Sequence, residues 1–257
     1  MSALSLPTLR SFRLDGRRAL VTGAGRGIGL ALASALAEAG AGVTLCARSL
    51  QEITEAADAI RATGGAAETL QLDVTDLDSV SEAISLAGPF DILVNNAGAN
   101  RPNRVDKVSA ADFDFVMGLN VRAAYFMAQA VAKRLIACGS TGSIINMSSQ
   151  MGHVGAADRS LYCASKWAVE GFSKAMAIDL APYGIRVNTI APTFIETPMT
   201  APFLQDEAFR QCVLSKIKLG RLGRVEDVTG AAVFLASDAS ALMTGASMVI
   251  DGGWTAD

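Results

Sequence analysis

Histidine, paired cysteines, aromatic residues and charge are all scarce in this chain of 257 residues. There is one histidine, His153, and the four cysteines, Cys46, Cys138, Cys163 and Cys212, lie far apart and form no CxxC pair. Zinc sites use clustered His and Cys ligands, so no metal site is expected. Unpaired thiols are typical of a reducing compartment, and we expect the protein in the cytoplasm.

Long apolar segments are also missing. Residues 1–16 lack the apolar core of a signal peptide, and the longest charge-free stretch, residues 135–157, is interrupted by Gly, Ser, Asn, Gln and His. A membrane-spanning helix needs about 20 mostly apolar residues, so none is expected there. Lys and Arg number 22 against 25 Asp and Glu, a net charge of −3, which argues against binding to nucleic acid. We therefore expect neither a membrane nor a nucleic acid as partner.

Short apolar runs alternate with longer helical patterns from residue 18 onward, and 51% of the residues are hydrophobic. Continuously apolar runs are typical of strands buried on both faces of a parallel sheet, and the helical patterns between them indicate βαβ units. The predicted fold is α/β, a Rossmann-type doubly wound parallel sheet of about seven strands with helices on both faces. Residues 1–257 are expected to form a single domain. The predicted strands are 19–23, 42–47, 67–74, 90–98, 142–149, 185–192 and 246–253.

A glycine-rich turn, TGAGRGIG (residues 22–29), joins the first predicted strand to the first predicted helix. Glycines permit a tight turn here and let backbone N–H groups approach a pyrophosphate at the positive end of the helix. An ordinary glycine-rich turn is the alternative, but its place in the first βα unit favours a dinucleotide site. The residues expected to contact the cofactor here are Gly23, Gly25, Arg26, Gly27, Ile28 and Gly29.

Several motifs in register resemble the single-domain short-chain dehydrogenase/reductase family, from about residue 15 to residue 253. They are TGAGRGIG, LDV (72–74), NNAG (95–98), Asn120, Ser149 and Tyr162-Cys163-Ala164-Ser165-Lys166. The resemblance implies an enzyme that transfers a hydride between a nicotinamide cofactor and a small carbonyl or secondary-alcohol substrate. It also implies a homotetramer.

The resemblance assigns catalytic roles to Asn120, Ser149, Tyr162 and Lys166. Tyr162 would exchange a proton with the substrate oxygen, Ser149 would hydrogen-bond that oxygen, and Asn120 would anchor a water chain to solvent. Lys166 would hold the nicotinamide ribose and tune Tyr162. Since the two lie four residues apart, they share one helix face, and we expect the ammonium and the oxidised nicotinamide ring to lower the tyrosine pKa from its usual value of about 10. The pair alone would also fit a solvated helix face, and Ser149 favours catalysis.

Further cofactor contacts follow from the same resemblance. Asp73 and Val74 would meet the adenine, whereas Asn95, Ala97 and Gly98 would line the nucleotide and support the sheet. The carboxamide end would lie against Pro192, Thr193, Ile195 and Thr197, in addition to Tyr162 and Lys166 at the ribose. The family usually has Pro-Gly where this chain has Pro192-Thr193.

The choice between NADP(H) and NAD(H) depends on the end of the second strand. An acidic residue there would bind the ribose 2′-hydroxyl, but this chain has Ala47 followed by Arg48 and Ser49. The guanidinium groups of Arg48 and Arg26 can hold a 2′-phosphate together, so NADP(H) is favoured. If Arg48 only begins the next helix at the surface, NAD(H) remains the alternative.

The substrate side offers weaker signals. Residues 194–222 lie where the family has a mobile lid, and their apolar side chains fit a cover that excludes water. His153, Gln150, Asn100 and Trp254 are further candidates for the substrate pocket. We expect a small ketone, polyol or sugar-like substrate.

Two other functions remain open at this point. The segment FIETPMT (194–200) resembles 3-oxoacyl-carrier-protein reductases, although the arginines that grip a carrier protein are replaced by Ser140 and Tyr183. A non-catalytic nucleotide-binding sensor or assembly protein is the alternative of another class, against which the complete catalytic set argues.

Overall fold

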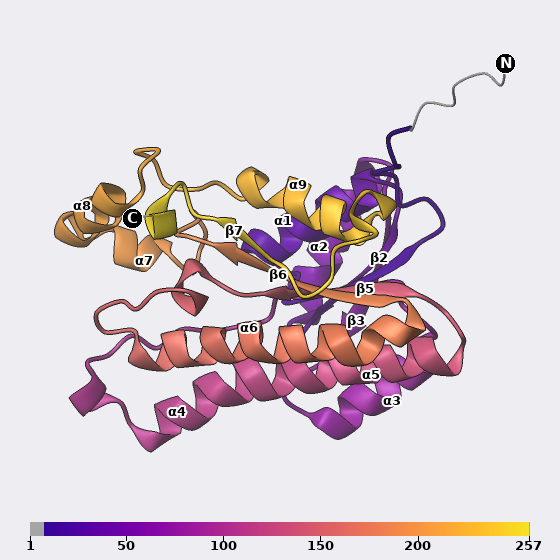
Figure 1. Ribbon diagram of the computed structural model, residues 1–257, viewed down its shortest axis with the longest axis horizontal. Coiled ribbons are helices and arrows are strands. Elements are labelled where there is room, and N and C mark those ends of the chain that lie inside the picture. The colour runs from indigo at the N-terminus through magenta and orange to yellow at the C-terminus, as the bar shows by residue number, and fades with distance from the viewer. Residues whose placement is uncertain (1–7, 257) are drawn as a thin grey trace, which may run out of the picture.

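The chain folds around a seven-stranded parallel sheet with the strand order β3-β2-β1-β4-β5-β6-β7 (Figure 1). The computed structural model describes residues 8–256; residues 1–7, part of the segment predicted to contain no signal peptide, and Asp257 lie outside the described residues. The strands are β1 (Arg18–Thr22), β2 (Gly42–Ala47), β3 (Ala66–Gln71), β4 (Ile92–Asn95), β5 (Gly142–Met147), β6 (Ile185–Pro192) and β7 (Ser247–Ile250). The predicted fold class is confirmed.

Helices cover both faces of the sheet (Figure 1). One face carries α1 (Gly27–Glu38), α2 (Leu50–Ala62) and α9 (Glu226–Ala236), and the other carries α3 (Leu77–Ala87), α5 (Ala124–Ala137) and α6 (Ser160–Leu180). Because successive strand residues point to opposite faces, Val21 of β1 packs in the first apolar layer and Leu20 packs in the second. The shorter helices are α4 (Ala110–Met117), α7 (Ala201–Leu204) and α8 (Glu207–Lys216).

The edge strands differ from the prediction that all strands are buried on both faces. Of β3 only Ala67 is buried, and no residue of β7 is fully buried, whereas β4 and β5 are buried throughout. An edge strand has a neighbour on one side only and is covered less completely by helices, so the prediction is wrong for these two. Strand β3 also ends at Gln71, which places Asp73 and Val74 in the connection that follows it.

The continuous helical run Ala110–Ala137 is long and apolar enough, by length and composition, to cross a membrane. It is the one such helix in residues 8–256, and core helices of globular proteins meet the same criterion. Its buried side, which includes Met127, Val131 and Leu135, packs in the second apolar layer of the sheet. A π-helical turn, Gly118–Ala123, interrupts the run at Asn120, and such turns are frequent at functional sites.

The strand order indicates which end of the sheet binds ligands. Strand β1 pairs with β2 on one side and with β4 on the other, so the connections leave in opposite directions from this point. In open parallel sheets, ligands bind at the carboxyl ends of the strands beside such a reversal. The glycine-rich turn follows β1 there, and Ser149 follows β5.

Candidate active site

Three glycines at the junction of β1 and α1 resist substitution, one because a side chain has no room and two because of their backbone conformation. A Cβ on Gly29 would lie 2.3 Å from the carbonyl oxygen of Gly23 and 2.5 Å from Asn96 Nδ2. Gly23 has φ +63° and Gly27 has φ +58°, in the left-handed region that glycine adopts without strain. The free backbone N–H groups of the first turn of α1 come immediately afterwards. A tight backbone cradle at a helix N-terminus fits a pyrophosphate.

Asn96, which the sequence did not single out, holds this turn in place. Its Nδ2 donates hydrogen bonds to the carbonyl oxygens of Thr22 (3.0 Å) and Gly23 (3.2 Å). In return, Thr22 Oγ1 accepts from the backbone N–H groups of Asn96 and Ala97, both at 3.0 Å. The NNAG motif pointed to this region, but it did not show which of its two asparagines faces the turn.

The neighbouring Asn95 supports the sheet instead. Its Nδ2 donates to the Ala124 carbonyl oxygen and to Asn146 Oδ1, each at 2.9 Å, and Asn146 in turn donates to Ser173 Oγ at 2.8 Å. These bonds tie β4 to β5 and to the helices α5 and α6. Because the amide is engaged there, a contact from Asn95 to a nucleotide would have to come from its main chain.

Ser149 lies just beyond β5 and is buried. Its Oγ donates to Gln150 Oε1 at 2.6 Å, accepts from the Met151 N–H at 3.1 Å, and lies 3.5 Å from the carbonyl oxygen of Pro192 at the end of β6. Ser149 also lies close enough to Tyr162 to favour a lower pKa of the phenol. The structure thus brings the serine and the tyrosine, thirteen residues apart, into one cluster.

Tyr162 and Lys166 share one face of α6, and Lys166 Nζ lies 5.5 Å from the centre of the tyrosine ring. Lys166 is buried and donates a hydrogen bond to the main-chain oxygen of Met147. Burial opposes ionisation of both groups: it raises the pKa of Tyr162 to about 12 and lowers the pKa of Lys166 to about 8. Among the chain's own groups, desolvation outweighs the opposing effect of Ser149, so the lowered tyrosine pKa expected with an oxidised nicotinamide ring stays a prediction for the complex.

Asn120 is joined to this cluster through Ser165, which the sequence did not single out. Asn120 Nδ2 donates to the Ala99 carbonyl oxygen (2.9 Å) and to Ser165 Oγ (3.0 Å), and its Oδ1 accepts from the Ala99 N–H (2.8 Å). Ser165 Oγ donates to the carbonyl oxygen of Tyr162 at 2.8 Å. The π-helical turn thereby connects the loop after β4 with the first turns of α6.

Gly98 and Thr197, two further predicted cofactor contacts, lie close to the catalytic candidates and to the glycine-rich turn, respectively. A Cβ on Gly98 would lie 3.3 Å from Asn120 Oδ1 and 3.8 Å from Lys166 Nζ, so the backbone passes close to both catalytic candidates. A Cβ on Gly27 would lie 3.6 Å from Thr197 Cβ, which places the segment after β6 against the glycine-rich turn. The structure therefore brings the glycine-rich turn, residue 98, residue 197 and the catalytic cluster to one end of the sheet.

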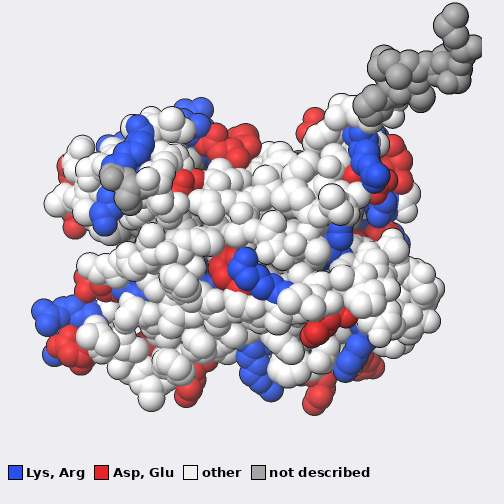
Figure 2. Space-filling view, viewed as in Figure 1, with Lys and Arg blue, Asp and Glu red and all other residues white. Residues whose placement is uncertain are grey.

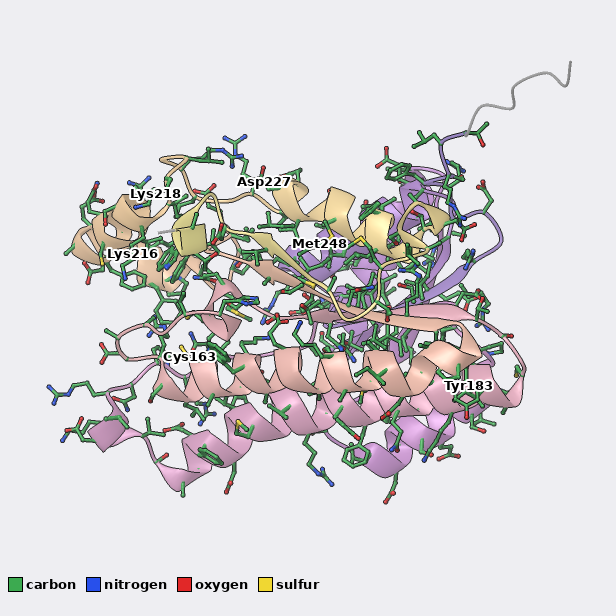
Figure 3. The ribbon with its side chains drawn as sticks, in the orientation of Figure 1. Cys163, Tyr183, Lys216, Lys218, Asp227 and Met248 are labelled. Carbon is green, nitrogen blue, oxygen red and sulfur yellow. The ribbon has the colours of Figure 1, made fainter. Side chains whose placement is uncertain are left out.

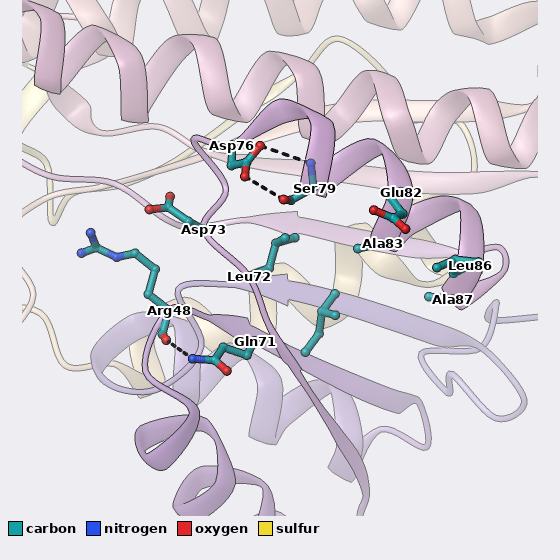
Figure 4. A pocket seen from close by; sticks show the side chains of 11 residues that line it. Arg48, Gln71, Leu72, Asp73, Asp76, Ser79, Glu82, Ala83, Leu86 and Ala87 are labelled. Carbon is teal, nitrogen blue, oxygen red and sulfur yellow. Dashed lines mark hydrogen bonds between the residues drawn. The ribbon is translucent and has the colours of Figure 1, made fainter.

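A groove of about 810 Å³ lies between β3 and α3, and Arg48, the first residue after β2, lines it (Figure 4). Arg48 is exposed at this groove, and its carbonyl oxygen accepts from Gln71 Nε2 at 3.0 Å. Asp73 lines the same groove and accepts from Thr75 Oγ1 at 2.7 Å, which together with Arg48 lowers its pKa. The side chain of Val74 instead packs in the core.

Arg26 and Ser49 already have partners near the groove. Ser49 Oγ accepts from the Glu52 N–H at 3.3 Å and so caps α2. Arg26 is 71% exposed at its side chain, and its Nη1 lies 3.3 Å from Glu52 Oε1. Glu52 was not predicted to matter, and no pattern in the sequence points to its contact with the glycine-rich turn.

The predicted lid forms an apolar cluster of its own around α7 and α8. The Phe194 ring packs against Phe209 at 5.7 Å and stacks on Trp254 at 5.8 Å between ring centres. Lys216 and Lys218 extend from this part of the chain, at the same end of the molecule as Cys163 (Figure 3). Tyr183, one of the two positions compared with carrier-protein arginines, lies at the opposite end of α6 (Figure 3).

Two pocket candidates, His153 and Asn100, differ in their hydrogen bonding, and the predicted cofactor contact Thr193 resembles Asn100. His153 Nε2 lies 3.0 Å from Ser247 Oγ and 3.3 Å from Glu170 Oε1, which makes it a hydrogen-bonded structural residue. Asn100 Oδ1 and Thr193 Oγ1, by contrast, are buried and have no hydrogen-bond partner among the described residues. Buried polar atoms are normally paired, so these two oxygens lack the partners that such atoms usually have.

Known proteins resemble this chain over almost its whole length. Residues 23–255 match the family described as enoyl-(acyl carrier protein) reductase. The gluconate 5-dehydrogenase of Gluconobacter oxydans is 41% identical over 248 residues, which cover 95% of this chain and 96% of that protein. The L-xylulose reductase of Bos taurus is 38% identical over 244 residues, covering 95% and 98%. A crystal structure of a gluconate 5-dehydrogenase from Burkholderia cenocepacia, in complex with NADP and tartrate, has a TM-score of 0.93 at 40% identity, covering 97% and 99%.

Proposed function

Because this chain belongs to the short-chain dehydrogenase/reductase family, we propose that it interconverts a ketone and a secondary alcohol of a small polyhydroxylated substrate, with NADP(H) as cofactor. The observation that carries the proposal is the single cluster formed by Ser149, Tyr162 and Lys166 beside the glycine-rich turn. NADPH would supply the hydride, and the protein's groups would position the carbonyl and supply the proton.

Each catalytic candidate has a chemical task in this proposal. Tyr162 donates the proton to the substrate oxygen in reduction and removes it in oxidation, and Ser149 hydrogen-bonds the same oxygen as charge develops. Lys166 holds the ribose and stabilises the phenolate of Tyr162. Asn120, bonded to Ser165 on α6, anchors the path by which protons reach solvent.

NADP(H) fits the residues on the adenosine side. Arg48 is exposed beside the groove, and no acidic residue ends β2, so a 2′-phosphate would meet a cation there. The relative from Burkholderia cenocepacia, described in complex with NADP, supports this choice. NAD(H) is the alternative if Arg48 makes no contact with the nucleotide.

A sugar, polyol or sugar acid is the substrate class that fits best. The unpaired Asn100 Oδ1 and Thr193 Oγ1 can each hydrogen-bond a hydroxyl group, and the relatives named above are a gluconate dehydrogenase and a sugar reductase. A 3-oxoacyl thioester remains the runner-up. A non-catalytic sensor would have no use for the Ser–Tyr–Lys cluster.

We also propose a homotetramer in the cytoplasm. Large apolar side chains are exposed along α4, α5 and α6, and such surface commonly forms subunit interfaces. These residues are Phe113, Phe115, Tyr125, Phe126, Trp167 and Ile178. Charged side chains are also sparse over the face formed by β7, α9 and α6 (Figure 2). All four cysteines are free thiols, which suits a reducing compartment.

The test is NADPH-dependent turnover by the purified protein, followed by the absorbance of NADPH, with ketoses, sugar acids and 3-oxoacyl thioesters compared. Tyr162→Phe should lower kcat roughly 10²- to 10⁴-fold while NADPH binding, measured by fluorescence titration, stays within about threefold. Normal turnover by this variant would contradict the assignment of the acid. A preference for the thioester would select the runner-up, and a monomeric mass would refute the tetramer.

A further inference from the structure

Arg159 is a buried arginine whose guanidinium makes no ion pair among the described residues, although the nearby carboxylate of Asp158 favours its charged form. Only 7% of its surface is exposed, and it lies immediately before α6. Within residues 8–256 it takes part in no ion pair, and its guanidinium makes a single hydrogen bond, from Nη1 to the main-chain oxygen of Asp158 at 3.3 Å. Native proteins pair buried charges because an unpaired charge away from water is unfavourable. The guanidinium is therefore suited to an anion that the chain itself does not provide.

The guanidinium lies between the lid and the catalytic tyrosine. Its central carbon is 5.5 Å from the ring centre of Phe203 in α7 and 5.7 Å from that of Phe209 in α8. Arg159 caps the N-terminus of α6, and Tyr162 lies in the first turn of the helix, three residues later. Its positive charge acts on the phenol and favours a lower tyrosine pKa. An anion bound by Arg159 would thus lie under the lid, one helical turn from the reacting oxygen.

The backbone before Arg159 is held in an unusual conformation. Asp158 has φ +57°, and it is the one non-glycine residue with positive φ in the described part of the chain. Its carbonyl oxygen accepts from the Asn103 N–H at 3.0 Å as well as from Arg159. Left-handed backbone at a non-glycine residue costs about 1 kcal/mol or more, and it is concentrated at functional sites.

We propose that Arg159 binds the carboxylate of the substrate, and that the substrate is accordingly a sugar acid. This inference rests on the proposed function, since it names the substrate of the same site. A planar guanidinium forms two parallel hydrogen bonds with a carboxylate, and the single charges balance. A phosphate ester carries nearly two negative charges at neutral pH and would be only half compensated here. The rest of the hydroxylated chain would reach Asn100 Oδ1 and Thr193 Oγ1.

The test compares D-gluconate with D-glucitol, which differ only by a carboxylate in place of a hydroxymethyl group at one end. Oxidation rates with NADP⁺ are measured for the wild type, Arg159→Gln, Arg159→Lys and the control Arg101→Gln. Arg101 already has a carboxylate partner, since its Nη1 lies 2.6 Å from Asp112 Oδ1. Thermal unfolding of each variant checks the fold.

We expect Arg159→Gln to raise KM for D-gluconate by roughly tenfold to a hundredfold, the value of a hydrogen bond to a charged group. KM for D-glucitol should change by less than about threefold, Arg159→Lys should keep part of the discrimination, and Arg101→Gln should change neither substrate. An equal loss for both substrates would overturn the inference, because Arg159 would then act only through the lid or Tyr162. A wild-type preference for D-glucitol, or for a phosphorylated ketose, would also overturn it.

Calorimetric titration of D-gluconate into the protein with NADP⁺ separates this inference from the proposed function. Binding to the wild type that is lost in Arg159→Gln would support the carboxylate site even if no substrate turned over, in which case the proposed activity alone would fail. Equal binding to both proteins, or no binding to the wild type, would reject the site.

Discussion

Lys166 Nζ donates a hydrogen bond of 2.8 Å to the main-chain oxygen of Met147, the last residue of β5. This bond connects α6 to β5, the strand that is followed by Ser149. The ammonium is buried, and burial lowers its pKa to about 8 although the carboxylate of Glu170 acts in the opposite direction. The lysine therefore positions the two parts of the site at the expense of stability.

Lys166→Met should change the pH dependence of unfolding. The lysine pKa is about 8 in the folded protein and near its usual 10.5 in the unfolded chain. Between these values the unfolded chain binds more protons, so the wild-type free energy of unfolding gains a contribution that grows as the pH rises through this window. The variant lacks that contribution. Urea unfolding at a series of pH values should show any advantage of Lys166→Met over the wild type shrinking from about pH 8 to about pH 10.

The exposed Lys174, four residues before Ile178 on the same helix, offers the control. Lys174→Met should follow the wild-type pH profile. Parallel profiles for Lys166→Met and the wild type would show that Lys166 has an ordinary pKa, and the cost of its burial would have to be abandoned.

Gly29→Ala should abolish NADPH binding. The new Cβ would lie 2.3 Å from the Gly23 oxygen, a contact that only a shift of the turn can relieve. We expect a loss of about 1–3 kcal/mol in the free energy of unfolding, measured with urea, together with loss of NADPH fluorescence enhancement. Gly230→Ala is the matched control in α9, where a Cβ would meet nothing within 4 Å, and it should stabilise the protein by about 0.5–1 kcal/mol. Tight NADPH binding by Gly29→Ala would mean that the turn does not contact the cofactor.

Asn96→Asp should be more harmful than Asn96→Ala, although aspartate has the same shape as asparagine. The two donors to the carbonyl oxygens of Thr22 and Gly23 would be replaced by a carboxylate that faces those same oxygens. A loss of about 2 kcal/mol in the free energy of unfolding is expected for Asn96→Asp, because buried acceptors are left unpaired beside a charge. NADPH affinity, measured by calorimetry, should fall as well, since the carboxylate would lie beside the pyrophosphate cradle. Equal effects of the two substitutions would show that the contact contributes only packing.

The sequence predicted the fold class and the four residues that the structure brings together at one end of the sheet, for separate physical reasons. Alternating apolar runs and helical patterns indicate parallel βαβ units whatever the details of packing. The spacing of Tyr162 and Lys166 places both on one helix face, and motif order added Ser149 and Asn120. Both signals can be recognised within short segments of the sequence. The structure brings the four residues to one end of the sheet.

Other features depend on contacts between distant segments, which no local pattern contains. Whether Asn95 or Asn96 holds the glycine-rich turn depends on where β4 ends and to which face each side chain then points. The raised pKa of Tyr162 follows from the desolvation of its phenol by the segments that surround it. Similarly, Glu52 reaches Arg26 only because α2 begins beside the glycine-rich turn.

That contact between Arg26 and Glu52 bears on how NADP(H) and NAD(H) are distinguished. Glu52 Oε1 lies 3.3 Å from Arg26 Nη1, so the carboxylate competes with a 2′-phosphate for this guanidinium. Arg48, by contrast, takes part in no ion pair among the described residues and stands exposed at the groove. Arg48 should therefore contribute more to NADPH binding than Arg26 does, and Glu52 should weaken that binding.

Arg48→Asp is accordingly expected to shift the preference from NADPH toward NADH. A carboxylate at this position would repel the 2′-phosphate and accept a hydrogen bond from a free 2′-hydroxyl, so the NADPH Kd should rise roughly tenfold to a hundredfold while the NADH Kd stays constant or falls. Glu52→Gln should act in the opposite direction and tighten NADPH several-fold, because it releases Arg26. Both dissociation constants are measured by calorimetry, and Arg10→Asp, at an exposed arginine before β1, controls for net charge. If Arg48→Asp binds NADPH as tightly as the wild type does, Arg48 faces solvent in the complex and NAD(H) becomes the better choice of cofactor.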